Sequence, residues 1–167
     1  MRLNSEQLER LLTEHRAPLR LLASTICQSP EDAVQQAFVK LATLSDAPPN
    51  PAAWLYRVVK NNSISQLRSE SRRKERERTV GAEKFRRQLF EDSGSEIDTD
   101  LLANALQQLD HESRQVVVAR IWGKLSFDVI ATECDCSSST AHRRYKDALN
   151  QMREILGLSN IEKLAEK

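Results

Sequence analysis

Apolar residues recur at helical spacing along most of the chain, and no stretch shows the alternation of a strand. The first helical pattern runs from Leu3 to Ile26. Pro18 lies inside it, and because proline has no backbone N–H we expect a break or kink there. The second pattern opens with Ser29 as a candidate N-cap and Pro30 at the first helical position, which predicts a helix start.

A third helix is predicted after the proline-rich turn SDAPPNP, with Pro51 at its start and apolar positions from Trp54 to Leu67. Beyond Leu67 the apolar period fades into charged sequence. Residues 68–78 hold six bases and three acids, while residues 91–100 hold five acids and no base. This composition predicts a helix tail that runs into a mobile charged linker.

Four more helices are predicted in the C-terminal part. Apolar positions over 101–109 indicate the first, and those over 116–121 indicate the second, which Gly123 would cap. Ser126 is a candidate N-cap for the third, and the last and longest should cover about 138–156.

These patterns favour an all-α protein with two small helical domains joined by a flexible charged linker. The predicted boundaries are 1–72, 73–97 and 98–167. Apolar residues make up 40% of the chain, enough for real cores, while aromatic residues are only 5%, which argues against a sandwich or barrel. The formal net charge of +1 does not identify a partner.

Several classes of protein and site find no support. No segment approaches the roughly 18 apolar residues of a membrane span, so we expect no membrane insertion. Cys27, Cys134 and Cys136 cannot all pair within one chain, so we expect a cytoplasmic protein with inert, buried thiols. No zinc-site spacing, phosphate-binding glycine loop or nucleophile motif is present, so we predict no metal, no cofactor and no enzymatic activity.

The stretch TECDCSSSTAHRRYKDAL, residues 132–149, joins two amphipathic helices through only a few residues. This is typical of a helix-turn-helix, in which the second helix enters the major groove of DNA. Ser137 or Ser138 can cap that helix. The hydroxyls of Ser139 and Thr140, with the free N–H groups beside them, can hold a phosphate.

Basic side chains follow on the same helix. His142, Arg143 and Lys146 lie opposite its apolar stripe, where they can reach base edges. A solvent-exposed helix face usually carries both acidic and basic side chains, but no acid occurs from Ser137 to Lys146. DNA binding is therefore favoured over an ordinary surface helix.

Two blocks resemble a known family. Bacterial sigma factors of the extracytoplasmic-function (ECF) type have a C-terminal DNA-binding domain similar to ALQQLDHESRQVVVARIWGKLSFDVIATECDCSSSTAHRRYKDALNQMRE. Their N-terminal promoter-melting domain is similar to SPEDAVQQAFVKLATL followed by PAAWLYRVVKNNSISQLRSESRR. The resemblance covers about residues 15–156 and implies a protein that binds core RNA polymerase and recognises two elements of promoter DNA.

The resemblance also implies roles for single residues. Polar positions that dock on core polymerase correspond to Asp32, Gln35 and Gln36. The segment for the minus-ten element corresponds to Trp54, Arg57, Lys60 and Asn61. For Trp54 a place in the core is the favoured alternative, whereas an amide such as Asn61 has little intrinsic preference for a helix interior.

The minus-thirty-five motif of the family lies over Ser139, Thr140, His142, Arg143, Arg144 and Lys146. By this alignment His142, Arg143 and Lys146 face bases, while Thr140 and Arg144 hold phosphates. Ser139 replaces a usual glycine of the motif. Asp110 stands where a proline usually precedes a helix, and it can cap that helix instead.

Three other readings stay open. A stand-alone regulator would use the helix-turn-helix alone and could not open a promoter unaided. An adaptor would bind proteins through the charged linker, and an enzyme would need motifs that the sequence lacks. An anti-sigma protein is a further candidate partner on which the sequence is silent.

Overall fold

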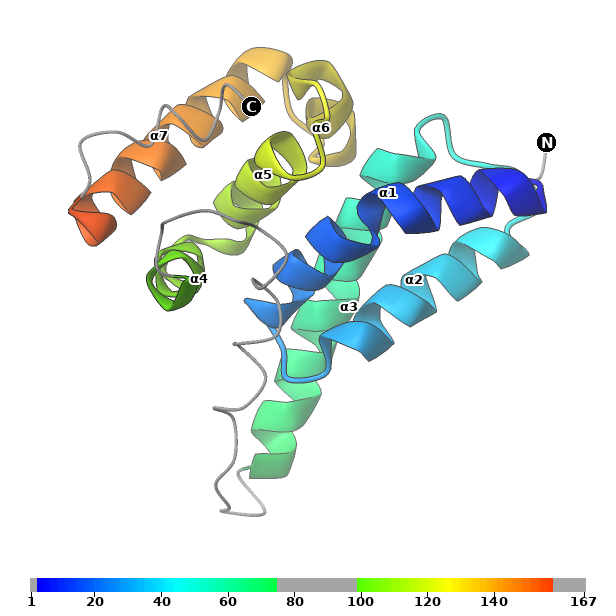
Figure 1. The fold of residues 1–167 in the computed structure, drawn as a ribbon, viewed down its shortest axis with the longest axis horizontal. Helices are drawn as coiled ribbons and strands as arrows, with labels where there is room; N and C mark the ends of the chain where they lie inside the picture. Colours follow the sequence, from blue (N-terminus) through cyan, green and yellow to red (C-terminus); the bar gives the residue numbers. More distant parts are fainter. Residues whose placement is uncertain (1–2, 75–98, 158–167) are drawn as a thin grey trace.

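The computed structural model describes residues 3–74 and 99–157, and within these ranges the chain forms seven α-helices and no strand (Figure 1). The all-α prediction is therefore confirmed. The predicted linker, 73–97, lies almost wholly outside the described residues. No helix in the described ranges combines the length and the apolar character needed to cross a membrane.

The N-terminal group consists of α1 (Ser5–Ser24), α2 (Pro30–Thr43) and α3 (Pro51–Lys74), each packed against the other two. Helix α1 continues through Pro18, so the predicted break was wrong. An interior proline costs about 3 kcal/mol in an isolated helix. Here Pro18 is buried beside Leu19 and Leu22, and burial of this apolar face holds the helix together.

Helix α2 begins at Pro30 as predicted, but the capping role assigned to Ser29 was wrong in detail. Ser29 occupies the N-cap position without a capping bond from its side chain. Glu31 and Asp32 lie in the first turn, where negative charge favours the positive end of the helix dipole. The start of α2 therefore rests on Pro30 and these carboxylates.

The C-terminal group consists of α4 (Thr99–Gln108), α5 (His111–Ile121), α6 (Phe127–Glu133) and α7 (Ser138–Leu156). Three of these helices begin with predicted side-chain caps. In each case a side-chain oxygen accepts a hydrogen bond from a backbone N–H of the first turn. The three capping residues are Asp110, Ser126 and Ser137. Between α6 and α7, Asp135 adopts a left-handed conformation with φ 50°, which makes the tight turn of the helix-turn-helix.

Gly123 has only part of the capping role predicted for it, because its backbone N–H donates to the Val118 carbonyl at 3.1 Å but the residue does not adopt the left-handed conformation. The C-cap of α5 is Trp122, and the left-handed residue in this loop is Lys124, with φ 52°. Gly123 is instead required by a neighbour in the N-terminal group. A Cβ at this position would overlap the hydroxyl of Tyr56 and lie 2.7 Å from its Cζ, so only glycine lets the ring approach this closely.

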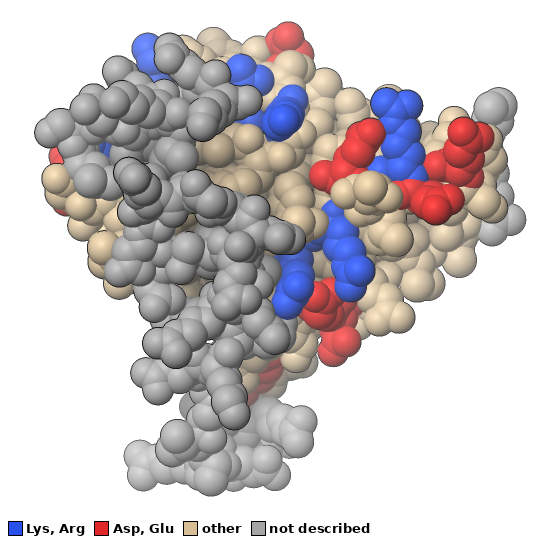
Figure 2. Space-filling model, in the orientation of Figure 1, with Lys and Arg blue, Asp and Glu red and all other residues tan. Residues whose placement is uncertain are grey.

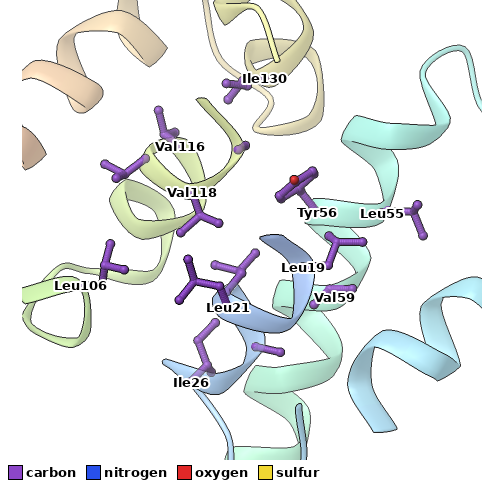
Figure 3. Close-up of a cluster of buried hydrophobic side chains, with 14 of the residues drawn as sticks. Leu19, Leu21, Ile26, Leu55, Tyr56, Val59, Leu106, Val116, Val118 and Ile130 are labelled. Carbon is purple, nitrogen blue, oxygen red and sulfur yellow. The ribbon is translucent and has the colours of Figure 1, made fainter. Parts of the chain in front are cut away.

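The two groups share one apolar core rather than two separate ones. Helix α5 packs on α1 and α3, and α6 packs on α3. In Figure 3 the side chains of Leu21 on α1 and Val118 on α5 lie close together, and Tyr56 points from α3 towards the C-terminal group. All three side chains are buried.

Candidate nucleic-acid interface

The N-terminal end of α7 presents a row of hydroxyl groups. The Ser137 Oγ accepts a bond from the Thr140 backbone N–H at 3.1 Å. The same oxygen lies 3.0 Å from Ser139 Oγ and 2.8 Å from Thr140 Oγ1. This places both predicted phosphate-binding hydroxyls at the positive end of a helix of 19 residues, a geometry that suits a phosphate oxygen.

The polar face of α7 carries the predicted base-reading residues. His142, Arg143 and Lys146 are all exposed, whereas Ala141 and Tyr145 on the opposite face are buried. The structure therefore brings the three side chains onto one solvent-facing surface, as the helical spacing predicts.

His142 has a packing partner that orients it. Its ring meets the Phe127 ring edge-on, with centroids 4.9 Å apart and an interplanar angle of 89°. Phe127 is the first residue of α6, so the imidazole is held against the other helix of the helix-turn-helix. Such a contact restricts the orientation of the imidazole ring.

The predicted minus-ten residues on α3 differ in their surroundings. Trp54 is buried, with 8% of its surface exposed, while Asn61 is exposed. Lys60 is only 7% exposed, and its ammonium donates to Glu112 at 2.6 Å. Arg57 lies 3.1 Å from the carboxylate of Glu133.

The neighbouring amides of α3 are not equivalent. Asn62 donates a bond of 3.2 Å to the carbonyl of Ala33, which ties α3 to α2. Asn61 is exposed on a different side of the helix. Asn61 therefore keeps a side chain available for a ligand, while Asn62 has a structural role.

Helix α2 carries the predicted polymerase-docking residues on its outer face. Asp32, Gln35 and Gln36 are exposed. Val39 is 56% exposed and follows Gln35 by four residues, so it lies on the same side. The sequence analysis did not single out Val39, although helical spacing from Gln35 was a usable signal. An apolar residue among polar ones is common in protein interfaces.

Electrostatics distinguishes α7 from the surface over α1. Figure 2 shows acidic and basic side chains side by side over α1, where Arg10 pairs with Glu14 at 2.9 Å and Arg20 with Glu31 at 2.7 Å. Paired charges of this kind leave little net field for a polyanion. In contrast, the first turn of α7, which directly precedes Arg143 on the helix, holds no acid.

The cysteines take no part in a metal site within the described ranges, where no cluster of three or more ligand side chains occurs. All three are free. Burial raises the pKa of the Cys134 thiol to about 11, so it stays protonated at neutral pH.

Charged residues that lie between the two groups escaped the sequence analysis. Glu112 and Glu133 come from α5 and α6 and hold cations of α3. Arg114 is 4% exposed and donates to the carbonyl of Thr25. The position of Arg114 beside Val117 and Val118 on an apolar face was a usable signal, but the two glutamates resemble ordinary surface acids.

Comparisons with known families agree with the geometry. The family model for Sigma-70 region 2 matches residues 11–73, and that for Sigma-70, region 4 matches residues 105–154. The first range contains most of α1, all of α2 and nearly all of α3, and the second contains the helix-turn-helix. No curated protein matches the sequence.

Two solved structures share the fold. One is the sigma factor RpoE in complex with the anti-sigma factor NepR from Bartonella quintana, at 22% identity and a TM-score of 0.69, covering 91% of this chain and 97% of the other. The second is CnrH in complex with the cytosolic domain of CnrY, at 22% identity and a TM-score of 0.64, covering 94% of this chain and 92% of the other.

Proposed function

This chain belongs to the sigma-70 family, with region 2 followed by region 4 as in its ECF-type members, and we propose how its residues divide the work of a sigma factor. A sigma factor binds core RNA polymerase, recognises promoter DNA and directs transcription initiation. In this division α2 contacts polymerase, α3 contacts the minus-ten element, and α7 contacts the minus-thirty-five element. The protein acts by binding rather than by catalysis, in the cytoplasm, where polymerase is found.

The observation that carries the proposal is the surface of α7. His142, Arg143 and Lys146 point outward from a helix whose buried face is fixed in the C-terminal core. In the proposed complex these three side chains read base edges in the major groove. Thr140 and Ser139 hold a phosphate at the helix start, and Arg144 contacts the backbone one turn later.

The minus-ten assignment rests on Arg57, Lys60 and Asn61. Lys60 follows Arg57 by three residues and Asn61 follows it by four. Both therefore lie on the same side of α3 as Arg57, and the three side chains cover a connected part of the helix surface. Cations of this kind follow a strand backbone, and an exposed amide can bond an unpaired base. Trp54 is buried, which supports a role in the core of the domain rather than base stacking.

An anti-sigma protein is proposed as a further partner. The RpoE relative was solved with an anti-sigma factor, and CnrH was solved with the cytosolic domain of CnrY. Both share the fold of this chain across its two helical groups. A protein of this class would compete with polymerase for the chain.

The test of the proposed function is co-elution of the full chain with core RNA polymerase on a sizing column. We expect stoichiometric binding by the wild type and its loss in Asp32→Ala/Gln35→Ala, because both side chains are exposed on α2. The matched control is Asp147→Ala/Asn150→Ala. It also removes an exposed acid and an exposed amide three residues apart on one helix, α7.

Two outcomes would count against the proposal. If the wild type does not co-elute with polymerase from the source organism, the chain does not act as a sigma subunit. If both double variants lose binding equally, the docking surface assigned to α2 is wrong.

A further inference from the structure

Asp147 is the first acid along helix α7, and it lies on the same outward face as the residues assigned to base readout. Counted from Arg143 at about 100° per residue, Asp147 is displaced by about 40° around the helix axis. The same count gives about 60° for Lys146 and about 100° for His142. Met152, at about 180°, is buried in the core. Asp147 is therefore nearer to the middle of the exposed face than either Lys146 or His142.

The carboxylate of Asp147 is exposed, and no other residue of the described ranges bonds or pairs with it. Arg143 precedes it by four residues, a spacing at which opposite charges on a helix can pair. The favourable order for such a pair is acid before base, and here the order is reversed. Both charged groups are therefore available to a ligand that approaches this face.

A carboxylate on a DNA-facing surface has a cost that a cation does not have. DNA phosphates repel it at every sequence, so it weakens binding unless a base donates a hydrogen bond to it. In the major groove cytosine offers an exocyclic amine, whereas guanine presents two acceptors and thymine presents an acceptor and a methyl group. Adenine places an acceptor, N7, beside its amine. A carboxylate is therefore best matched by cytosine and is left buried without a donor at guanine or thymine.

The separation of Arg143 and Asp147 along α7 sets the position of this base. One helical turn advances about 5.4 Å, and stacked base pairs are about 3.4 Å apart. With α7 in the major groove, Asp147 thus reaches a base pair one or two steps from the one that Arg143 contacts. Glu154, the other acid of α7, lies about 10.5 Å further along the helix, beyond the turns that enter the groove.

We propose that Asp147 is a specificity-determining residue of the minus-thirty-five contact, where it accepts a hydrogen bond from the exocyclic amine of a cytosine and excludes guanine and thymine. This inference rests on the proposed function, which places α7 in the major groove. The cations of α7 attract every DNA sequence, while Asp147 opposes all sequences except those with a donor in the right place. The helix therefore selects its site by repulsion as well as by attraction.

The test is selection of promoter DNA by the reconstituted polymerase complex, from a pool in which the minus-thirty-five element is randomised. For the wild type we expect one position enriched in cytosine, one or two base pairs from the position that responds to Arg143→Ala. Asp147→Ala should reduce this cytosine enrichment at least about fivefold and leave the other positions unchanged. It should also bind promoters with guanine or thymine at that position more tightly than the wild type does, because a repulsive charge is gone.

A second substitution makes the test directional. Asp147→Asn keeps the size of the side chain and replaces one oxygen with an amide nitrogen. Asparagine can bond adenine through both N6 and N7. We expect the preference at the same position to move from cytosine to adenine, a change that a residue with only a structural role or a general effect of charge could not produce.

The matched controls are Glu154→Ala and Glu154→Gln. Glu154 is an exposed acid on the same side of α7 as Asp147, two turns further from the helix start. Both controls should leave all base preferences unchanged. Every variant should still co-elute with core polymerase, because α7 contacts DNA rather than polymerase in the proposed complex.

Four results would overturn the inference. Asp147→Ala could change no single position, it could affect all sequences alike, Asp147→Asn could keep the cytosine preference, or Glu154→Ala could cause the same shift. If Arg143→Ala still alters one position in that experiment, α7 reads bases and only the role of Asp147 is wrong. A wild type that selects no sequence, or that does not bind polymerase, would instead contradict the proposed function.

Discussion

The guanidinium of Arg114 on α5 donates a bond of 2.7 Å to the backbone carbonyl of Thr25, at the C-terminal end of α1. It also donates to three carbonyls at the end of α4, those of Leu106, Gln107 and Leu109. The cation thus lies between the C-terminal ends of two helices, where the helix dipoles favour positive charge. Burial lowers the pKa of Arg114 to about 10, so it remains charged at neutral pH.

We predict that Arg114→Met lowers the free energy of unfolding by about 2–4 kcal/mol, because it leaves buried carbonyls without a donor. Urea denaturation followed by circular dichroism measures this. Arg143→Met is the matched control, since Arg143 is exposed and its loss should change stability by less than about 0.5 kcal/mol. Equal effects of the two variants would show that Arg114 has no special role.

Gly123→Ala should weaken the packing of region 4 on region 2, since the new Cβ would overlap the Tyr56 hydroxyl. The same Cβ would lie 2.7 Å from the Ala119 carbonyl within region 4, so part of the loss is local. A double-mutant cycle with Tyr56→Phe separates the two causes, because phenylalanine removes the overlapping oxygen. We expect a coupling energy of about 0.5–3 kcal/mol, and a value of zero would show that the Tyr56 hydroxyl does not cause the effect, leaving the ring Cζ and the Ala119 carbonyl as its sources.

Stability should fall as the pH is lowered through the histidine range. Burial lowers the pKa of His15 below its usual 6.5, an effect that outweighs Glu14, whose carboxylate lies 4.0 Å away and raises the pKa. The unfolded chain then binds more protons than the folded one below about pH 6.5, so acid favours unfolding. Burial also lowers the pKa of His111, with the same sign.

The measurement is urea unfolding at about pH 7.5 and about pH 5.5. Both pH values lie above the pKa of most carboxyl groups, so the difference reports mainly on histidines. We expect a lower free energy of unfolding at the acid value, and a smaller difference in His15→Phe, which keeps an aromatic ring beside Tyr56. An unchanged difference in that variant would mean that His15 does not contribute.

Two arginines of α7 should affect promoter binding differently. Arg143→Ala should cost about 1–3 kcal/mol at one base position and change which sequences are preferred. Arg144→Ala should weaken all sequences alike and reduce the slope of affinity against salt by about one phosphate contact. Binding of the polymerase complex to a set of single-base promoter variants at several salt concentrations measures both. Uniform losses in both variants would show that the two roles were wrongly assigned.

Local patterns in the sequence predicted most of the fold. The bounds of α7 and the caps Asp110, Ser126 and Ser137 followed from residue type and spacing, because capping and helix amphipathicity act over a few residues. The helix does not break at Pro18 because burial of the surrounding face outweighs the local cost of the proline. Intrinsic helix propensity does not include the stabilisation that comes from tertiary packing.

The candidate site was predictable only where it depends on one helix. The outward placement of Arg143 and Lys146 follows from the buried stripe of α7. The pairing of Lys60 with Glu112 spans 52 positions of sequence, and no local rule selects one partner among many acids. Gly123 was noticed for its type, but its reason lies in the Tyr56 ring of a distant helix.

The apolar packing of α5 on α1, in which Leu21 and Val118 are both buried, has a consequence for the protein in solution (Figure 3). Once the regions separate, both side chains meet water unless polymerase or another protein covers them. An opened chain without such a partner would expose an apolar surface to other chains. The fraction of protein lost to aggregation would then increase with protein concentration. The packing of the two regions against each other therefore also protects the chain from aggregation. Variants in which the regions separate more easily should aggregate faster in storage.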